Sequence, residues 1–164
     1  MVPISSPRTK APRLAFCSRS TARGSVDGAW WPSSTNLGAE LPDVLAVLGS
    51  RIGEVRRVVY DPSIWPTTPS RIIRRGVAIS VDPYNMVTSE TIYLIGTHSR
   101  DAVLFVVPPS CAAAVVDRVL GAVSEDAGPM NAYVLRHLLG HFASAEKESA
   151  GAARKAARLA GSAM

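Results

Sequence analysis

The chain has 164 residues, 47% of them hydrophobic, which fits one domain with a buried core and lies well above the composition of disordered proteins. The sequence contains no run of about 18 apolar residues, the length that a transmembrane helix needs. The first residues also lack the apolar core of a secretory signal. We therefore expect a cytoplasmic protein with no membrane partner.

The formal net charge of +5 belongs to the two ends of the chain. Residues 1–24 carry five basic and no acidic side chains, whereas residues 25–142 carry nine basic and eleven acidic ones. A near-neutral centre argues against a basic groove on the folded part. We expect three segments: a disordered basic arm over 1–11, a single domain over 12–142 and a flexible, alanine-rich basic tail over 143–164.

Hydrophobic patterns divide the centre of the chain into strands and helices. Pro42 lacks an amide donor and suits a first helical turn, which predicts a helix over 42–51 after a separate turn at 37–40. Residues 71–81 are expected to form one strand, bent at Gly76. The expected elements are strands at 13–20, 54–61, 71–81, 91–96 and 102–107, the helix at 42–51, a helix from Ser110 and a short helix that includes Val134 and Phe142.

The strand at 102–107, AVLFVV, has no polar position and is expected at the centre of the sheet. Short links between the middle strands favour antiparallel pairing. The predicted fold class is α+β: a single domain with a mostly antiparallel sheet of four to five strands and two or three helices packed on one face.

Familiar signatures of catalysis are missing. The sequence holds no GxSxG nucleophile elbow, no phosphate-binding glycine loop and no HExxH. His137 and His141 are four apart on a predicted helix, but no third ligand stands near them, so no metal is expected. Cys17 and Cys111 lie in apolar surroundings without a neighbouring base and are expected to be buried thiols. An enzyme is therefore not favoured, and no cofactor is expected.

Two pairs of adjacent arginines occur on predicted strands, at 56–57 and 74–75. One side chain of each pair should face each side of the sheet. A buried member could form a structural ion pair with Asp27, Asp61 or Asp82, and several exposed ones could form an anion-binding surface. The sequence leaves both interpretations open.

A basic patch is expected near the end of the chain. Arg154, Lys155 and Arg158 have the spacing of one helical face, and with the N-terminal arm they could follow the phosphates of a nucleic acid. A solubilising tail accounts for the same residues and is the favoured interpretation.

The segment VDGAWWPSS, from Val26 to Ser34, contains two of the three tryptophans. A loop that holds a carboxylate next to two indoles could be a ligand site. Asp-Gly, Pro32 and the following hydroxyl and amide side chains also suit a connector between a strand and a helix, with the tryptophans clamping it onto the sheet. The structural interpretation is preferred.

The ordered pieces DGAWWP, ELP, VYD (residues 59–61), Trp65 and VVPP resemble an uncharacterised family of small, mostly actinobacterial proteins that is classed as a domain of unknown function. The resemblance covers about residues 12–128. It implies a shared fold and a cytoplasmic setting, and it implies no catalytic residues.

The favoured function is a non-enzymatic binding or regulatory module, with unknown partners and a homodimer as one assembly to test. Its candidate ligand contacts are Asp27, Trp30, Trp31, Trp65 and Arg71. A small-molecule binder or small enzyme with a tryptophan-walled pocket is one alternative. Association with nucleic acid or the ribosome through the basic tails is the other.

Overall fold

The computed structural model describes residues 13–17, 25–66, 68–85, 90–97, 100–125 and 130–161. The first elements are β1 (Arg13–Phe16), β2 (Ser25–Val26), β3 (Gly28–Trp31) and α1 (Leu37–Ile52). The middle of the chain forms β4 (Val55–Tyr60), β5 (Arg71–Arg74), β6 (Val77–Pro83), β7 (Thr91–Gly96) and β8 (Asp101–Val106). The last elements are α2 (Ala113–Glu125), β9 (Met130–Asn131) and α3 (Ala132–Gly161).

Seven strands form one mixed sheet in the order β1-β3-β8-β7-β4-β6-β5, and β2 pairs with β9 in a separate two-stranded sheet. The β3–β8 and β4–β6 pairs are parallel, and the other pairs are antiparallel. The predicted α+β class is confirmed. The predicted number of four to five strands is wrong, because the sheet has seven, and the sheet is mixed, because the β3–β8 and β4–β6 pairs are parallel.

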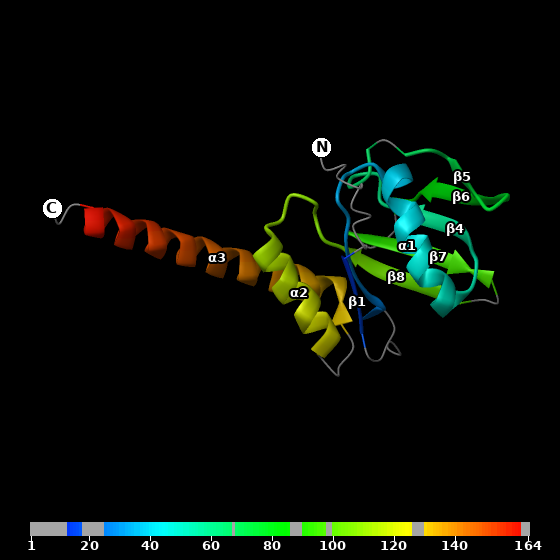
Figure 1. The fold of residues 1–164 in the computed structure, drawn as a ribbon. Coiled ribbons are helices and arrows are strands. Elements are labelled where there is room, and N and C mark those ends of the chain that lie inside the picture. The colour runs from blue at the N-terminus through cyan, green and yellow to red at the C-terminus, as the bar shows by residue number, and fades with distance from the viewer. Residues whose placement is uncertain are drawn as a thin grey trace, which may run out of the picture.

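Helix α1 covers one face of the sheet (Figure 1). The Asn36 side chain caps it by accepting a hydrogen bond from the amide of Ala39, at 3.3 Å. The helix begins at Leu37 and contains Pro42, so the predicted break between a turn and a helix is absent. One lost amide bond at an exposed proline is outweighed by the buried stripe of Leu37, Leu41, Val44, Leu45, Leu48 and Ile52.

Helices α2 and α3 pack on the opposite face, over β1, β3 and β8. The expectation that all helices share one face is therefore wrong. Strand β8 explains the arrangement, because Leu104 and Val106 join the core under α1 whereas Phe105 joins the core under α2. A strand buried on both faces has no need of a polar position, which accounts for the sequence AVLFVV.

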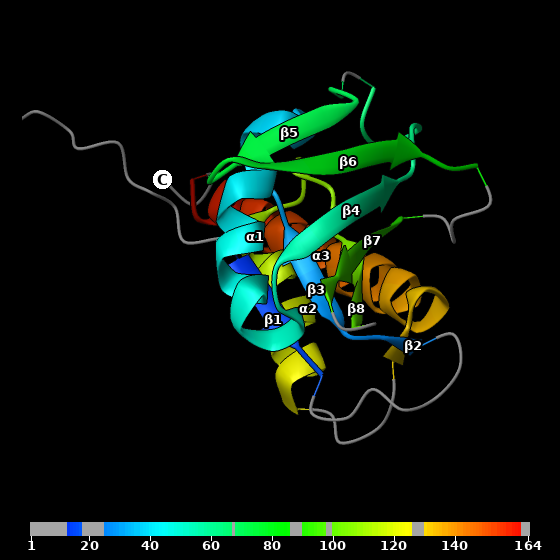
Figure 2. The ribbon, with the colours of Figure 1, turned by 90° about the vertical axis from the view of Figure 1, so that its right-hand side faces the viewer.

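The expected single strand over 71–81 is a hairpin of β5 and β6. Arg75 and Gly76 connect the strands with φ angles of 51° and 77°. Positive φ at both residues of a two-residue loop is the geometry that matches the twist of a hairpin. Figure 2 shows the hairpin lying beside α1 at the edge of the sheet.

Helix α3 is 30 residues long, which corresponds to about 45 Å. Its first part packs against α2, and every residue from Lys147 to Gly161 is exposed (Figure 1). The segment expected to be a flexible tail is thus helical as far as Gly161, and its flexibility stays a prediction. The N-terminal arm over 1–11 lies outside the described residues. Among the described helices, none combines the length and apolar character needed to cross a bilayer.

Candidate functional site

Asp27 connects the segment before β3 to the neighbouring strand β8. Its amide donates to the carbonyl of Val103, and its Oδ2 accepts from the amide of Val103, both at 2.7 Å. The amide of Cys17 donates to the Asp27 carbonyl at 2.8 Å. The carboxylate thus accepts a hydrogen bond that a backbone carbonyl would accept in a continuous strand. Asp27 therefore has a structural role.

Trp30 and Trp65 lie together in the core beneath α1. Their rings stack at a centroid distance of 5.5 Å and an interplanar angle of 25°, and each residue is 1% exposed. The Nε1 donor of Trp65 has no hydrogen-bond partner among the described residues. Two enclosed rings present no wall to solvent, so their burial supports the structural interpretation of this pair.

Trp31 is half-buried on the other face of the sheet. Its Nε1 donates to the carbonyl of Pro108 at 3.1 Å, and the Arg13 guanidinium lies 4.7 Å from its ring centroid. Arg13 also forms an ion pair with Asp117 of α2. Trp31 therefore holds β1 and the segment after β8 together.

Arg71 is exposed on the edge strand β5, and the structure does not bring it to the tryptophans. Among these candidate ligand contacts, the structure therefore brings the side chains of Trp30 and Trp65 together. A ligand role for Asp27, Trp30, Trp31, Trp65 and Arg71 stays a prediction.

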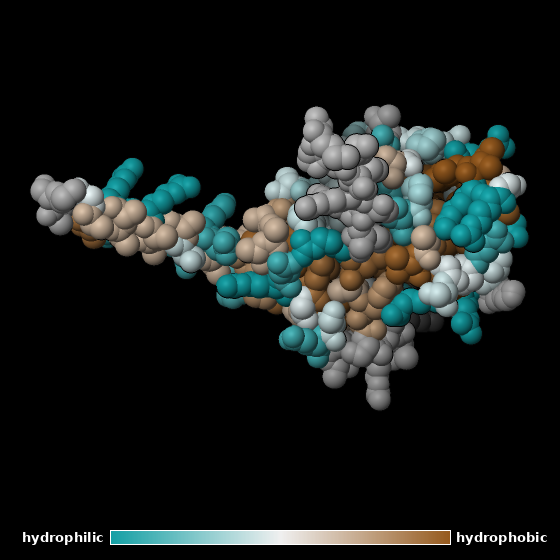
Figure 3. All heavy atoms as spheres, viewed as in Figure 1, coloured by the Kyte–Doolittle hydropathy of each residue, from teal (hydrophilic) through white to brown (hydrophobic). Residues whose placement is uncertain are grey.

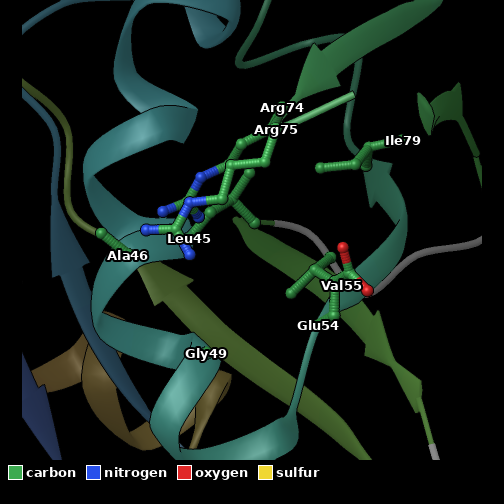
Figure 4. Close-up of a pocket in the computed structure, with 8 residues that line it drawn as sticks. All are labelled: Leu45, Ala46, Gly49, Glu54, Val55, Arg74, Arg75 and Ile79. Atoms are coloured by element: carbon green, nitrogen blue, oxygen red, sulfur yellow. The ribbon is translucent and has the colours of Figure 1, made fainter. Parts of the chain in front are cut away.

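A pocket of about 350 Å³ lies between α1 and the β5–β6 hairpin (Figure 4). Leu45, Val55 and Ile79 form an apolar floor. The remaining lining residues are Ala46, Gly49, Glu54, Arg74 and Arg75. A concave surface with an apolar floor and a few charged groups is the usual form of a small-molecule site.

Two guanidinium groups converge on one wall of this pocket. In Figure 4 the side chains of Arg74 and Arg75 lie next to each other and reach toward Leu45 and Ala46 of α1. Within the described residues, neither arginine forms an ion pair or a hydrogen bond through its side chain. Adjacent guanidiniums without an acidic partner repel each other, and an anion would relieve that repulsion.

The pocket's carboxylate lies away from the two guanidiniums. Glu54 is beside Val55 in Figure 4, and its Oε2 lies 3.5 Å from Nη2 of Arg56. Both side chains of this ion pair are about half exposed. Because Glu54 has its own cation, the positive charge of Arg74 and Arg75 remains available to a ligand.

The hairpin turn explains why two consecutive arginines reach the same pocket. Consecutive side chains on a continuous strand would face opposite sides of the sheet, as the sequence analysis expected for this pair. Arg74 is the last residue of β5 and Arg75 is already in the turn. The signal for this turn in the sequence was Gly76, because glycine adopts positive φ without strain.

The other arginine pair, at 56–57, forms ion pairs with acidic side chains. Nε of Arg57 lies 2.9 Å from Oδ2 of Asp82 on the neighbouring strand β6, with both side chains partly exposed. Arg56 pairs with Glu54. These contacts leave 74–75 as the pair that faces a pocket.

The histidines and the basic patch lie on α3. His137 and His141 are exposed beside a shallow hollow that also includes Tyr133 and Arg136. In the part of the chain that the structure describes, no three potential ligands are grouped as a metal site would require. Arg154, Lys155 and Arg158 are exposed in the outer part of the helix, and their binding to nucleic acid stays a prediction.

Cys17 and Cys111 are half-buried at the edge of the core beneath α2. Desolvation raises the pKa of the Cys111 thiol above its usual value. A raised pKa lowers the thiolate fraction at neutral pH. Both thiols are less buried than the sequence analysis predicts.

Comparison with protein families matched residues 13–123 to a family of unknown function (DUF5994), and the chain belongs to that family. The match covers β1 through most of α2, including every residue that lines the pocket. Comparison with curated proteins and with solved structures produced no match.

Proposed function

Because membership of a family of unknown function assigns no activity, we propose from the pocket that this protein is a binding module for a small organic anion. The observation that carries the proposal is the pair Arg74 and Arg75, which face an apolar floor without an acidic partner among the described residues. The apolar floor would contact the body of the ligand, and the guanidiniums would contact its charged group.

A binding role is favoured over a catalytic one by the groups that line the pocket. Its described lining offers no hydroxyl, thiol or imidazole, and its one carboxylate, Glu54, is paired with Arg56. General acid–base or nucleophilic catalysis would need such a group near the bound molecule. A cytoplasmic location and an actinobacterial source stay predictions.

The proposal is tested by titrating the full chain with benzoate and phenyl phosphate at low, constant ionic strength, followed by calorimetry and by backbone amide NMR shifts. At least one anion should bind and shift the amides of Leu45, Gly49 and Ile79. Replacing the pair, Arg74→Gln with Arg75→Asn, should weaken binding at least about tenfold, as expected for loss of charged hydrogen-bond donors.

Arg71→Gln is the matched control. Arg71 is exposed on the same strand, but its side chain alternates to the sheet face opposite that of Ile72, which packs against the α1 core. Its replacement removes one charge and should leave binding unchanged. If the control weakens binding equally, the loss of affinity in the double variant is an effect of net charge and not of the pocket. Failure of both anions to bind would overturn the proposal.

Gly49→Leu tests the location of the ligand independently of charge. A Cβ at Gly49 would have no heavy atom within 4 Å, so a side chain can be added without a clash. Leucine also favours a helix more than glycine does. The variant should fold and lose anion binding, because its side chain extends from the pocket wall. A folded variant with unchanged affinity would place the ligand elsewhere.

A further inference from the structure

We infer that the charged group of the ligand is a phosphate monoester in its dianionic form, carried on a compact apolar body. This inference rests on the proposed function, because it assigns a ligand class to the same pocket between α1 and the β5–β6 hairpin. Three features of the pocket carry it: the number of guanidiniums, the state of Glu54, and the size and character of the floor.

The number of donors favours phosphate over carboxylate. A carboxylate has two oxygens, which a single arginine fork satisfies in a bidentate pair. A carboxylate on Arg74 would therefore leave Arg75 beside it with its charge uncompensated. A phosphate monoester presents three terminal oxygens and carries close to two negative charges at neutral pH, so it can engage both forks at once.

The charge balance of the pocket points the same way. Arg74 and Arg75 contribute two positive charges, and the one carboxylate in the lining is balanced by Arg56, at 3.5 Å. A dianion neutralises this wall, whereas a monoanion leaves an excess charge. Two adjacent guanidiniums are also a costly arrangement without such a ligand, because like charges at short range repel.

The other walls restrict the size of the ligand. A volume of about 350 Å³ is at the lower end of small-molecule sites, which suits one phosphate and a compact group better than a dinucleotide. Leu45, Val55 and Ile79 provide only apolar atoms for that group to contact. Glu54 stands on the opposite side from the guanidiniums and disfavours a second anionic group there.

The experiment compares ligands of one shape and different charge: phenyl phosphate, phenyl sulfate and benzoate, with inorganic phosphate as the fragment without an apolar body. Titrations use the full chain at pH 7.5 and constant ionic strength. Phenyl phosphate should bind about tenfold more tightly than phenyl sulfate or benzoate, and more tightly than inorganic phosphate, because it alone combines two charges with a ring.

Protonation of the ligand provides a second readout. The second pKa of a phosphate monoester is near 6, whereas arginine stays charged at any pH at which the protein folds. Affinity for phenyl phosphate should therefore fall between pH 7.5 and 5.5, and affinity for phenyl sulfate should not. In a variant with Arg75→Asn, a residue that tolerates positive φ, the preference for phenyl phosphate should disappear while the fold is kept.

The outcomes separate this inference from the proposed function. Binding of benzoate or phenyl sulfate as tight as that of phenyl phosphate would overturn the phosphate assignment and leave an anion-binding module. A phosphate preference that survives in the Arg75→Asn variant would overturn the two-arginine geometry. Absence of binding by any of these anions would overturn both proposals.

Discussion

The carboxylate of Asp27 holds a position in the sheet that a backbone carbonyl would otherwise occupy. We expect Asp27→Ala to lower the free energy of unfolding by about 1–3 kcal/mol, because the half-buried amide of Val103 loses an acceptor 2.7 Å away. Asp27→Asn keeps a carbonyl oxygen and should lose less. Urea unfolding followed by tryptophan fluorescence measures both variants.

The same variants test the hypothesis that Asp27 contacts a ligand. If the role of Asp27 is structural, the Asp27→Ala variant should bind anions with the same affinity as the unmodified chain. The comparison is made where the variant is folded, at a urea concentration far below its unfolding midpoint. A variant with full stability and no anion binding would reverse the assignment and restore the ligand hypothesis drawn from VDGAWWPSS.

At the scale of elements, β1 and β3 approach each other more closely than a side chain permits. A Cβ at Gly28 would lie 2.2 Å from the carbonyl oxygen of Ala15, so alanine there must displace backbone. We expect Gly28→Ala to cost about 1–3 kcal/mol or more in unfolding free energy. Gly49→Ala in α1 is the control, and should stabilise the protein by about 0.5–1 kcal/mol. Equal midpoints in urea would contradict the close packing of β1 on β3.

Elements with strong local patterns could be predicted from the sequence, and elements defined by distant partners could not. The apolar stripe in α1 and the apolar run in β8 are local patterns, and each predicts burial from the residues of that element alone. The four residues of β3 show no alternation, and their strand character comes from pairing with β1 and β8. From the sequence alone, β3 is therefore predicted as part of a loop.

The candidate pocket was predictable only in part. Arg74 and Arg75 stand out as a pair in the sequence, which led to an anion-binding surface as one of two open interpretations. Their convergence depends on a turn at Arg75–Gly76 and on α1 as the opposite wall. The first of these had a sequence signal, and the second is a tertiary contact between segments that no local pattern relates.

At the scale of the whole molecule, α3 extends beyond the body, and Figure 3 shows hydrophilic side chains that protrude from a weakly hydrophobic helix surface. Since Lys147 to Gly161 are all exposed, we expect a chain ended at Ala145 to keep its unfolding free energy within about 0.5 kcal/mol. Its maximum dimension in small-angle X-ray scattering should fall by about 24 Å.

A chain ended at Asn131 is the destabilised comparison, because it also removes Leu135 from the core beneath α2. An unchanged maximum dimension after truncation at Ala145, or a large loss of stability, would mean that the outer part of α3 packs against the body or against another copy of the chain.

The parallel pairing of β3 with β8 has a consequence for how the protein folds. Gly28 pairs with Leu104, so this pairing closes a loop in the chain that contains α1 and four other strands, β4 to β7. Strands β7 and β8 are neighbours in the chain, as are β5 and β6, and can pair early. Contacts between distant segments bear the entropy of loop closure and form slowly. We expect the paired strands β1 and β3 to join the sheet last. Trp30 and Trp31, which lie in β3, should therefore reach their native environment late in folding.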